Sequence, residues 1–135
     1  MTRKDARAAA VQLLYEYEFH TELEPSVFLR QAELAFAETF DGYTLRLFSG
    51  VLEHKEELDA LIVAHSQNWR LERIHRISKT ILRLAIFEML FDSEVETPIA
   101  INEAVELSKQ FELGESAAFI NGVLGGIARG NEQHA

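Results

Sequence analysis

Three cations and a tyrosine near the start of the chain have side chains suited to one kind of ligand. Arg3, Lys4 and Arg7 lie within seven residues, with Asp5 among them, and Tyr15 follows about two helical turns later. Cations at a helix N-terminus oppose the helix dipole, so helix stability does not explain them. Arginine and lysine bind phosphate, and an aromatic ring stacks on an unpaired base. The pattern indicates either single-stranded RNA binding or a solvated basic end with Tyr15 half-buried in packing.

A second basic segment covers residues 70–83. Its charged residues are five cations and one acid: Arg70, Arg73, Arg76, Lys79 and Arg83 against Glu72. At 100° per residue, Arg76, Lys79 and Arg83 lie about opposite the apolar stripe of the helix expected there. This face is either simply solvated or binds a partner, and the residues leave both interpretations open.

Composition limits the class of protein. The 135 residues suit one domain, spanning residues 1–135, and a 47% hydrophobic fraction is typical of a globular protein. The absence of cysteine excludes disulfides and thiolate chemistry. No apolar run has a membrane-spanning length and no signal peptide is visible, so we expect a cytoplasmic protein with no membrane contact. A net charge of -9 argues against a protein that coats nucleic acid, but it leaves room for a local basic patch.

Catalytic and metal-binding patterns are weak. The chain has five histidines, and Glu72 with His75 forms one Glu-x-x-His pair. A di-iron bundle requires two such pairs and two further glutamates, and the second pair is missing. There is no glycine-rich phosphate loop and no persuasive nucleophile–base pair. We therefore expect no enzyme activity, no metal site and no cofactor.

The periodicity of apolar residues is helical nearly throughout. Thr2 and Asp5 resemble a capping box at the start of the first helix, and Tyr17 lies on its core stripe. Asp41-Gly42 separates two helical segments, and Thr97-Pro98 is a clean helix start. No segment shows convincing β alternation. The prediction is an all-α fold, a single compact bundle of six or seven helices, over residues 2–19, 21–41, 43–67, 71–92, 97–111 and 116 onward.

Several stretches together resemble the NusB family of transcription antitermination proteins. They are "ARAAAVQLLYEYEF", "RISKTILRLAIFEMLF", "TPIAINEAVELSKQF" and "SAAFINGVLGGIA", and the likeness is weakest over residues 20–68. The resemblance implies a helical, non-catalytic protein that binds boxA-type single-stranded RNA together with NusE, a ribosomal small-subunit protein. It also implies a place in the antitermination complex on RNA polymerase, in support of ribosomal RNA transcription. Some members of the family are homodimers that occlude their RNA site.

The resemblance also implies site residues. Those expected to bind RNA are Arg3, Lys4, Arg7, Tyr15, Glu115, Phe119 and Asn121, and those expected to bind the partner are Glu72, Arg76, Ser78 and Lys79. Asp5 and Ala118 stand where the family often has cations, which predicts modest RNA affinity or reliance on the partner. Ser78 stands at a position that is often acidic, which weakens the expected partner contact.

Two alternatives stay open at this point. A helical protein-interaction module without RNA binding has the same composition and periodicity. Asn102 and Asn121 are poor helix formers. Each is either a structural residue that bonds backbone carbonyls or, for Asn121, part of the RNA surface beside Phe119.

Overall fold

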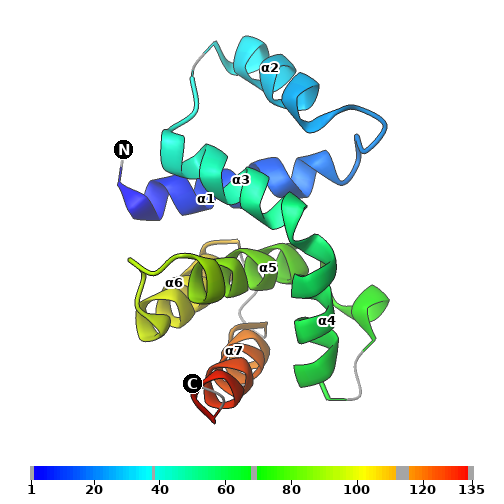
Figure 1. The fold of residues 1–135 in the computed structure, drawn as a ribbon. Helices are drawn as coiled ribbons and strands as arrows, with labels where there is room; N and C mark the ends of the chain where they lie inside the picture. The colour runs from blue at the N-terminus through cyan, green and yellow to red at the C-terminus, as the bar shows by residue number, and fades with distance from the viewer. Residues whose placement is uncertain (1, 38, 68–69, 112–115, 134–135) are drawn as a thin grey trace.

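The computed structural model describes residues 2–37, 39–67, 70–111 and 116–133, with side chains described as far as residue 130. Over these residues the chain forms seven α-helices and one short 3-10 helix, with no strand (Figure 1). They are α1 (Arg3–Tyr17), α2 (Pro25–Phe36), α3 (Gly42–Glu53), α4 (Lys55–His65), η1 (Leu71–Arg73), α5 (Arg76–Phe91), α6 (Thr97–Gln110) and α7 (Ser116–Gln133). The all-α prediction is confirmed.

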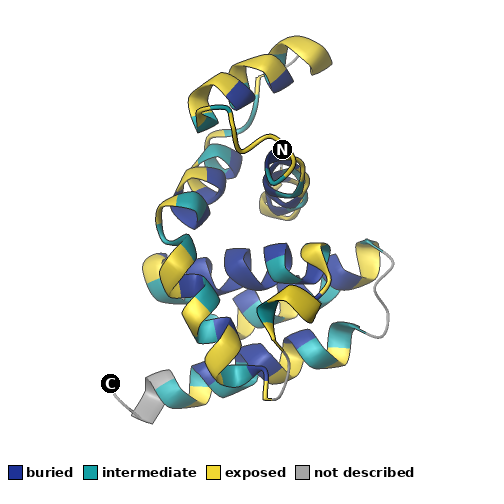
Figure 2. Ribbon diagram, turned by 90° about the vertical axis from the view of Figure 1, so that its right-hand side faces the viewer, coloured by how far each residue is buried: buried dark blue, intermediate teal, exposed yellow. Residues whose placement is uncertain are grey.

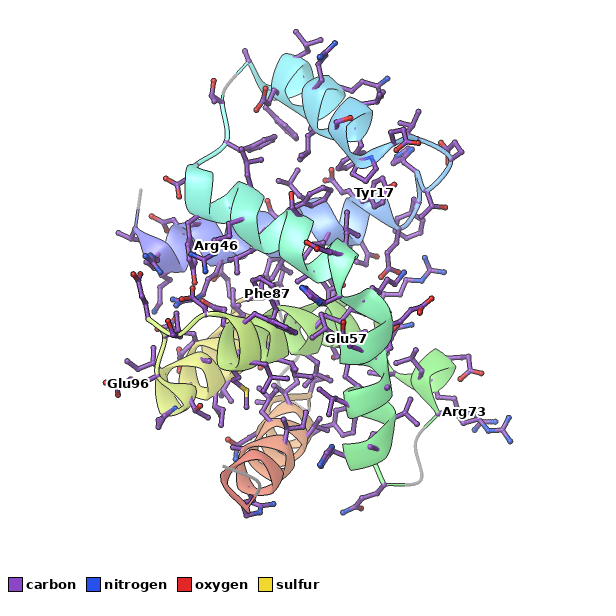
Figure 3. The ribbon with its side chains drawn as sticks, in the orientation of Figure 1. Tyr17, Arg46, Glu57, Arg73, Phe87 and Glu96 are labelled. Carbon is purple, nitrogen blue, oxygen red and sulfur yellow. The ribbon has the colours of Figure 1, made fainter. Side chains whose placement is uncertain are left out.

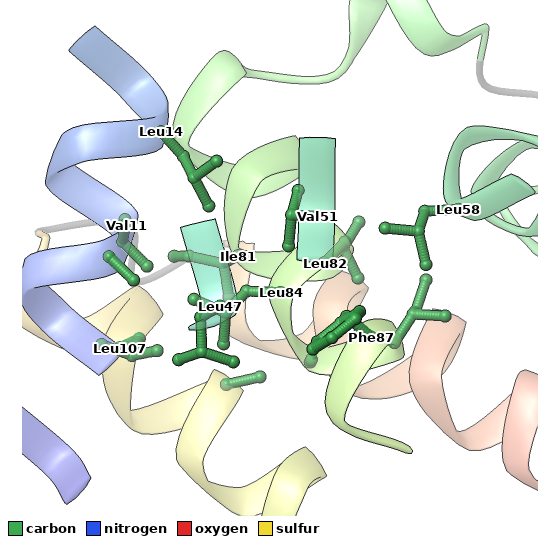
Figure 4. Packing of buried hydrophobic residues seen from close by; sticks show 14 of the residues in the cluster. Val11, Leu14, Leu47, Val51, Leu58, Ile81, Leu82, Leu84, Phe87 and Leu107 are labelled. Atoms are coloured by element: carbon green, nitrogen blue, oxygen red, sulfur yellow. The ribbon is translucent and has the colours of Figure 1, made fainter. Parts of the chain in front are cut away.

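Helix α5 is the centre of the molecule. Its sequence is apolar on nearly every face, and such a helix must be covered on all sides. It contacts α1, α3, α4, α6 and α7, and Figure 2 shows it almost wholly buried. Figure 4 shows its Ile81, Leu82, Leu84 and Phe87 packed among residues of the surrounding helices. None of the described helices is long and apolar enough to cross a membrane.

The first helix begins and packs as its sequence predicts. Thr2 is the N-cap, and its Oγ1 accepts a hydrogen bond of 3.0 Å from the Asp5 N–H. Tyr17 is buried, and its hydroxyl donates to the Leu23 carbonyl oxygen at 2.6 Å. Its ring packs edge-on against Phe48, with the centroids 5.8 Å apart. The local cap and the apolar stripe therefore fix where α1 starts and which side faces the core.

Two expected helices are shorter than predicted. The segment 43–67 is divided at His54, which ends α3 and precedes α4. The His54 ring stacks on Phe91 with centroids 4.1 Å apart, and its Nδ1 lies 3.0 Å from Glu57 Oε1. The segment 71–92 becomes helical only at Arg76, because the buried Ile74 is extended. Contacts with distant residues override the helical pattern at both places.

Helix α2 is the least covered helix of the fold. It buries only Phe28 and Ala32, and Figure 2 shows most of its surface exposed. Phe28 holds it to the core by stacking on Phe48, with centroids 6.0 Å apart. Leu34 and Phe36 are among the exposed large hydrophobic residues.

Candidate nucleic-acid interface

The first turn of α1 exposes two of the predicted cations. Arg3 has its guanidinium carbon 3.8 Å from the centroid of the Tyr43 ring, and its Nη2 lies 3.9 Å from Glu94 Oε2. Lys4 is exposed beside α6. The hollow of about 320 Å³ next to it is lined by Lys4, Glu103, Glu106, Leu107, Lys109 and Gln110. Both cations can be reached by a phosphate backbone.

Arg7 lies in a different environment from the other two cations. It is 5% exposed, and its Nε lies 2.9 Å and 3.0 Å from the two carboxylate oxygens of Glu88, which is also buried. Burial alone lowers the pKa of Arg7, but the hydrogen bond and charge of Glu88 outweigh it, so the pKa lies above its ordinary value. A phosphate contact from Arg7 would require this ion pair to open.

Tyr43 completes the buried cluster around Glu88. Its hydroxyl donates a hydrogen bond to Glu88 Oε2, and its oxygen lies 3.1 Å from Asp92 Oδ2. Burial raises the pKa of the Tyr43 phenol, and the hydrogen bond to Glu88 and the nearby carboxylates raise it further. The cluster joins α1, α3 and α5, and the Tyr43 ring in turn supports Arg3.

We expect Tyr43 to stay protonated at alkaline pH while the protein is folded. The folded state holds this proton more tightly than the unfolded state. Stability from this group is therefore full below about pH 10 and falls as the pH rises further. Tyr43→Phe should leave the ultraviolet tyrosinate titration of the folded protein unchanged between about pH 10 and 11, and reduce it only in denaturant. A loss of amplitude in the folded protein would contradict this assignment.

Tyr15 is half-buried near the end of α1, and an exposed aromatic residue adjoins it. The rings of Tyr15 and Phe19 lie nearly perpendicular, at 71°, with their centroids 5.4 Å apart. The guanidinium carbon of Arg76 lies 4.8 Å from the centroid of the Phe19 ring. The structure thus brings Tyr15, expected at the RNA site, and Arg76, expected at the partner site, onto one surface.

The flank of α1 expected to carry the RNA site is only partly open. Arg7 and Val11, between Lys4 and Tyr15 on that flank, are buried. The accessible groups at its two ends are Lys4 and the exposed part of Tyr15. Spacing along a single helix puts Lys4, Arg7 and Tyr15 on one side of α1, but it does not show that other helices cover the middle of that side.

The start of α7 contributes a third part of the candidate interface. Phe119 is half-buried against the core, whereas Ala118 and Asn121 are exposed. Asn121 and Asn102 line the same hollow between α6 and α7. Both asparagines are exposed, which favours a surface role over a bond to buried backbone carbonyls. Glu115 lies outside the described residues.

Lys109 is a residue that the sequence did not single out. It lines the hollow beside Lys4 and also the hollow that contains Asn121. Its side chain is well exposed, and its Nζ lies 3.6 Å from Glu106 Oε1. A lone lysine near the end of a helix gives no signal in the sequence, and only the packing of α6 beside α1 and α7 places it between the two surfaces.

The predicted partner residues do not form one uniform surface. Glu72 and Arg76 are exposed and Lys79 is half-buried. Ser78 is buried, and its Oγ has no hydrogen-bond partner in the part of the chain that is described. Ser78 is therefore covered in the free chain, and its contact with a partner stays a prediction.

The expected basic face of residues 76–83 also needs correction. Arg83 is buried rather than solvated. Its Nε lies 2.6 Å from Asp59 Oδ1, and its Nη1 lies 2.7 Å from Glu18 Oε1. The wheel placed Arg83 away from the main stripe, but α4 and the end of α1 cover that side of α5.

The Glu72–His75 pair does not have the geometry of a bundle metal site. Glu72 belongs to η1 and His75 precedes α5, so the two residues do not share a helix, and both are exposed. Within the described ranges, no three His, Asp or Glu residues come together in a way that could hold a metal ion.

Comparisons with known proteins agree with this arrangement of helices. The family model described as the NusB family matches residues 4–129. A transcription antitermination protein NusB of Nitratidesulfovibrio vulgaris is 40% identical over 148 residues, covering 97% of this chain and 90% of that protein. The corresponding protein of an Exiguobacterium species is 40% identical over 131 residues, covering 96% and 98%.

Solved structures show the same fold. T. maritima NusB superposes with a TM-score of 0.81 at 27% identity, covering 96% of this chain and 92% of that chain. A structure described as antitermination factors NusB and NusE in complex with dsRNA gives a TM-score of 0.80 at 24% identity, covering 95% and 96%. With a family match over residues 4–129 and relatives 40% identical along nearly their whole length, this chain belongs to the NusB family of transcription antitermination proteins.

Proposed function

We propose that this chain is a single-domain, non-catalytic antitermination factor that binds boxA-type single-stranded RNA together with NusE. In this role it joins the antitermination complex on RNA polymerase and supports ribosomal RNA transcription. The proposed location of the protein is the cytoplasm. The observation that carries the proposal is family membership combined with an accessible surface of cations, an aromatic ring and an exposed amide. The residues of this surface are Arg3, Lys4, Tyr15, Lys109 and Asn121.

The positions of Lys4 and Tyr15 suit an extended strand. They are eleven positions apart, which corresponds to about 16 Å along the helix and a net rotation of about 20°. Lys109 continues the cationic surface from Lys4 toward Asn121. A strand that passes over the covered middle of this side of α1 meets phosphate-binding groups at the Lys4 end and a stacking group at the Tyr15 end. Arg7 supports this surface from inside, because its pair with Glu88 ties α1 to α5.

Reliance on NusE follows from the charge of the chain. The net charge of -9, the exposed Asp5 and the uncharged Ala118 all weaken attraction to phosphate. A related NusB structure contains NusE and RNA together. We expect boxA-type RNA to bind more tightly when NusE is saturating, because a composite surface adds the missing cations.

The test is an RNA titration at several salt concentrations, with and without NusE. Lys4→Ala should make the negative slope of log K against log salt shallower by about 0.7, since one phosphate contact is lost. Tyr15→Ala should cost about 1–3 kcal/mol of RNA binding with little change in slope, and Tyr15→Phe should be milder because the ring remains. Light scattering of the free protein shows whether it forms a homodimer, and the same measurement with RNA added shows whether RNA displaces that dimer.

Thermal unfolding of the same variants separates binding from packing. If Tyr15→Ala lowers stability but leaves RNA affinity of the folded protein unchanged, Tyr15 is a packing residue only. If the wild-type chain binds NusE but no RNA in either condition, it is a helical protein-interaction module, and the proposed RNA function is wrong.

A further inference from the structure

Tyr43 is a half-buried residue whose ring lies beside the first cation of the candidate RNA surface. It is the second residue of α3, and the neighbouring Thr44 ties this end of α3 to α1. The Thr44 hydroxyl is buried and donates a hydrogen bond of 3.0 Å to the Ala6 carbonyl oxygen. Figure 3 labels Arg46, about one turn along α3 from Tyr43, and shows the start of α3 next to the first turns of α1. The family resemblance assigned no role to Tyr43.

The Tyr43 ring is held at its hydroxyl end. The hydroxyl donates a hydrogen bond to Glu88 Oε2, and its oxygen lies 3.1 Å from Asp92 Oδ2. Both carboxylates are buried on α5 or directly after it. Because the side chain is fixed at the backbone and again at the hydroxyl, the face of the ring is a firm surface on which another group can rest.

Arg3 rests on that face. Its guanidinium carbon lies 3.8 Å from the ring centroid, and half of its side chain is still exposed. A guanidinium that stacks through its flat face keeps the N–H donors in its plane for another ligand. The Glu94 carboxylate lies 3.9 Å from Arg3 Nη2, which is too far for a hydrogen bond. The ring therefore holds Arg3 without using the groups that bind phosphate.

We propose that Tyr43 is a positioning residue of the RNA site, whose ring holds the Arg3 guanidinium ready to bind a phosphate of the RNA backbone. This inference rests on the proposed RNA function and deepens it by adding a residue from α3. An arginine that moves freely in water loses side-chain freedom when it binds, and holding it beforehand removes part of that cost. Tyr43 acts through Arg3 and makes no contact of its own with the RNA.

The experiment measures the affinity of boxA-type RNA for the chain saturated with NusE, by fluorescence anisotropy at several salt concentrations. Tyr43→Leu removes the ring and should weaken binding by about 2- to 12-fold. Tyr43→Phe keeps the ring and loses only the hydroxyl, so it should retain RNA affinity although it lowers the unfolding temperature. Arg3→Ala should make the negative slope of log K against log salt shallower by about 0.7.

A double-mutant cycle separates positioning from a general loss of structure. In the Arg3→Ala background, Tyr43→Leu should have no further effect on RNA affinity, because the side chain that it positions is absent. Lys4→Ala is the matched background, since Lys4 follows Arg3 in the chain but lies beside α6. Tyr43→Leu should weaken binding there as much as in the wild type. Thermal unfolding of each variant gives the folded fraction to which its affinity is referred.

The failures are distinguishable. Unchanged or tighter RNA binding in Tyr43→Leu, with binding weakened in Lys4→Ala, would overturn the positioning role and leave the proposed function standing. An equal loss with and without Arg3 would make Tyr43 a residue of fold stability alone, and an equal loss in Tyr43→Phe would assign the effect to the hydroxyl. Either result would overturn the proposal. No RNA binding by the wild-type complex would overturn both the positioning role and the proposed function.

Discussion

Glu88→Ala should lower the free energy of unfolding by about 3–5 kcal/mol, because it leaves the buried Arg7 guanidinium without its counter-charge. Arg7 is 5% exposed and Glu88 is less so, and Tyr43 also loses a hydrogen-bond acceptor. Domains of this size have total stabilities of about 5–15 kcal/mol, so a marginal protein would be largely unfolded. Urea denaturation followed by circular dichroism measures the loss.

Two further variants show whether charge or shape is responsible. Glu88→Gln keeps the volume and an oxygen acceptor, so its cost should be smaller than that of Glu88→Ala. The double variant Arg7→Met with Glu88→Leu removes both charges and fills the space, and it should recover most of the stability. If Glu88→Ala unfolds at the wild-type urea concentration, Arg7 has another adequate partner and the buried pair is not the link between α1 and α5.

Arg83→Ala should cost about 3 kcal/mol, because two carboxylates on different segments then lose their shared cation. Asp59 receives hydrogen bonds from Arg83 Nε and Nη2, and Glu18 receives one from Nη1. Arg83→Lys should recover only part of the loss, since an ammonium group cannot reproduce the planar fork that holds both partners. Chemical denaturation is again the measurement.

Lys109→Ala is the matched control for Arg83. Its ion pair with Glu106 is exposed, so the loss should stay below about 1 kcal/mol and shrink in high salt. The loss in Arg83→Ala should persist in high salt, because the Arg83 side chain is only 7% exposed. Equal effects of the two variants would show that the Arg83 cluster is no stronger than a surface pair.

Four arginines from the predicted sites and the predicted basic face divide into an exposed pair and a buried pair. Arg3 and Arg7 are predicted at the RNA site, Arg76 at the partner site, and Arg83 only on the basic face, and no pattern in the sequence distinguishes the buried ones from the exposed ones. Arg3 and Arg76 are exposed against aromatic rings, whereas Arg7 and Arg83 are buried in ion pairs. Helical periodicity describes one helix at a time, so it could not show which sides of α1 and α5 other helices cover.

The sequence by itself determined the features that depend on neighbours within a few residues. The Thr2 cap, the core position of Tyr17 and the helical class of every element follow from hydrogen bonding and apolar spacing along one turn or two. The family resemblance also rested on short continuous stretches, and the comparisons confirm it.

The tertiary structure alone decided the features whose partners are far apart in the chain. Glu88 lies 81 positions from Arg7, and Phe19 meets Arg76, which is 57 positions away. The division of residues 43–67 at His54 likewise depends on Phe91. The free energy of burying a charge or of stacking a ring depends on the groups around it in space. The types of two distant residues do not determine whether the fold brings them into contact.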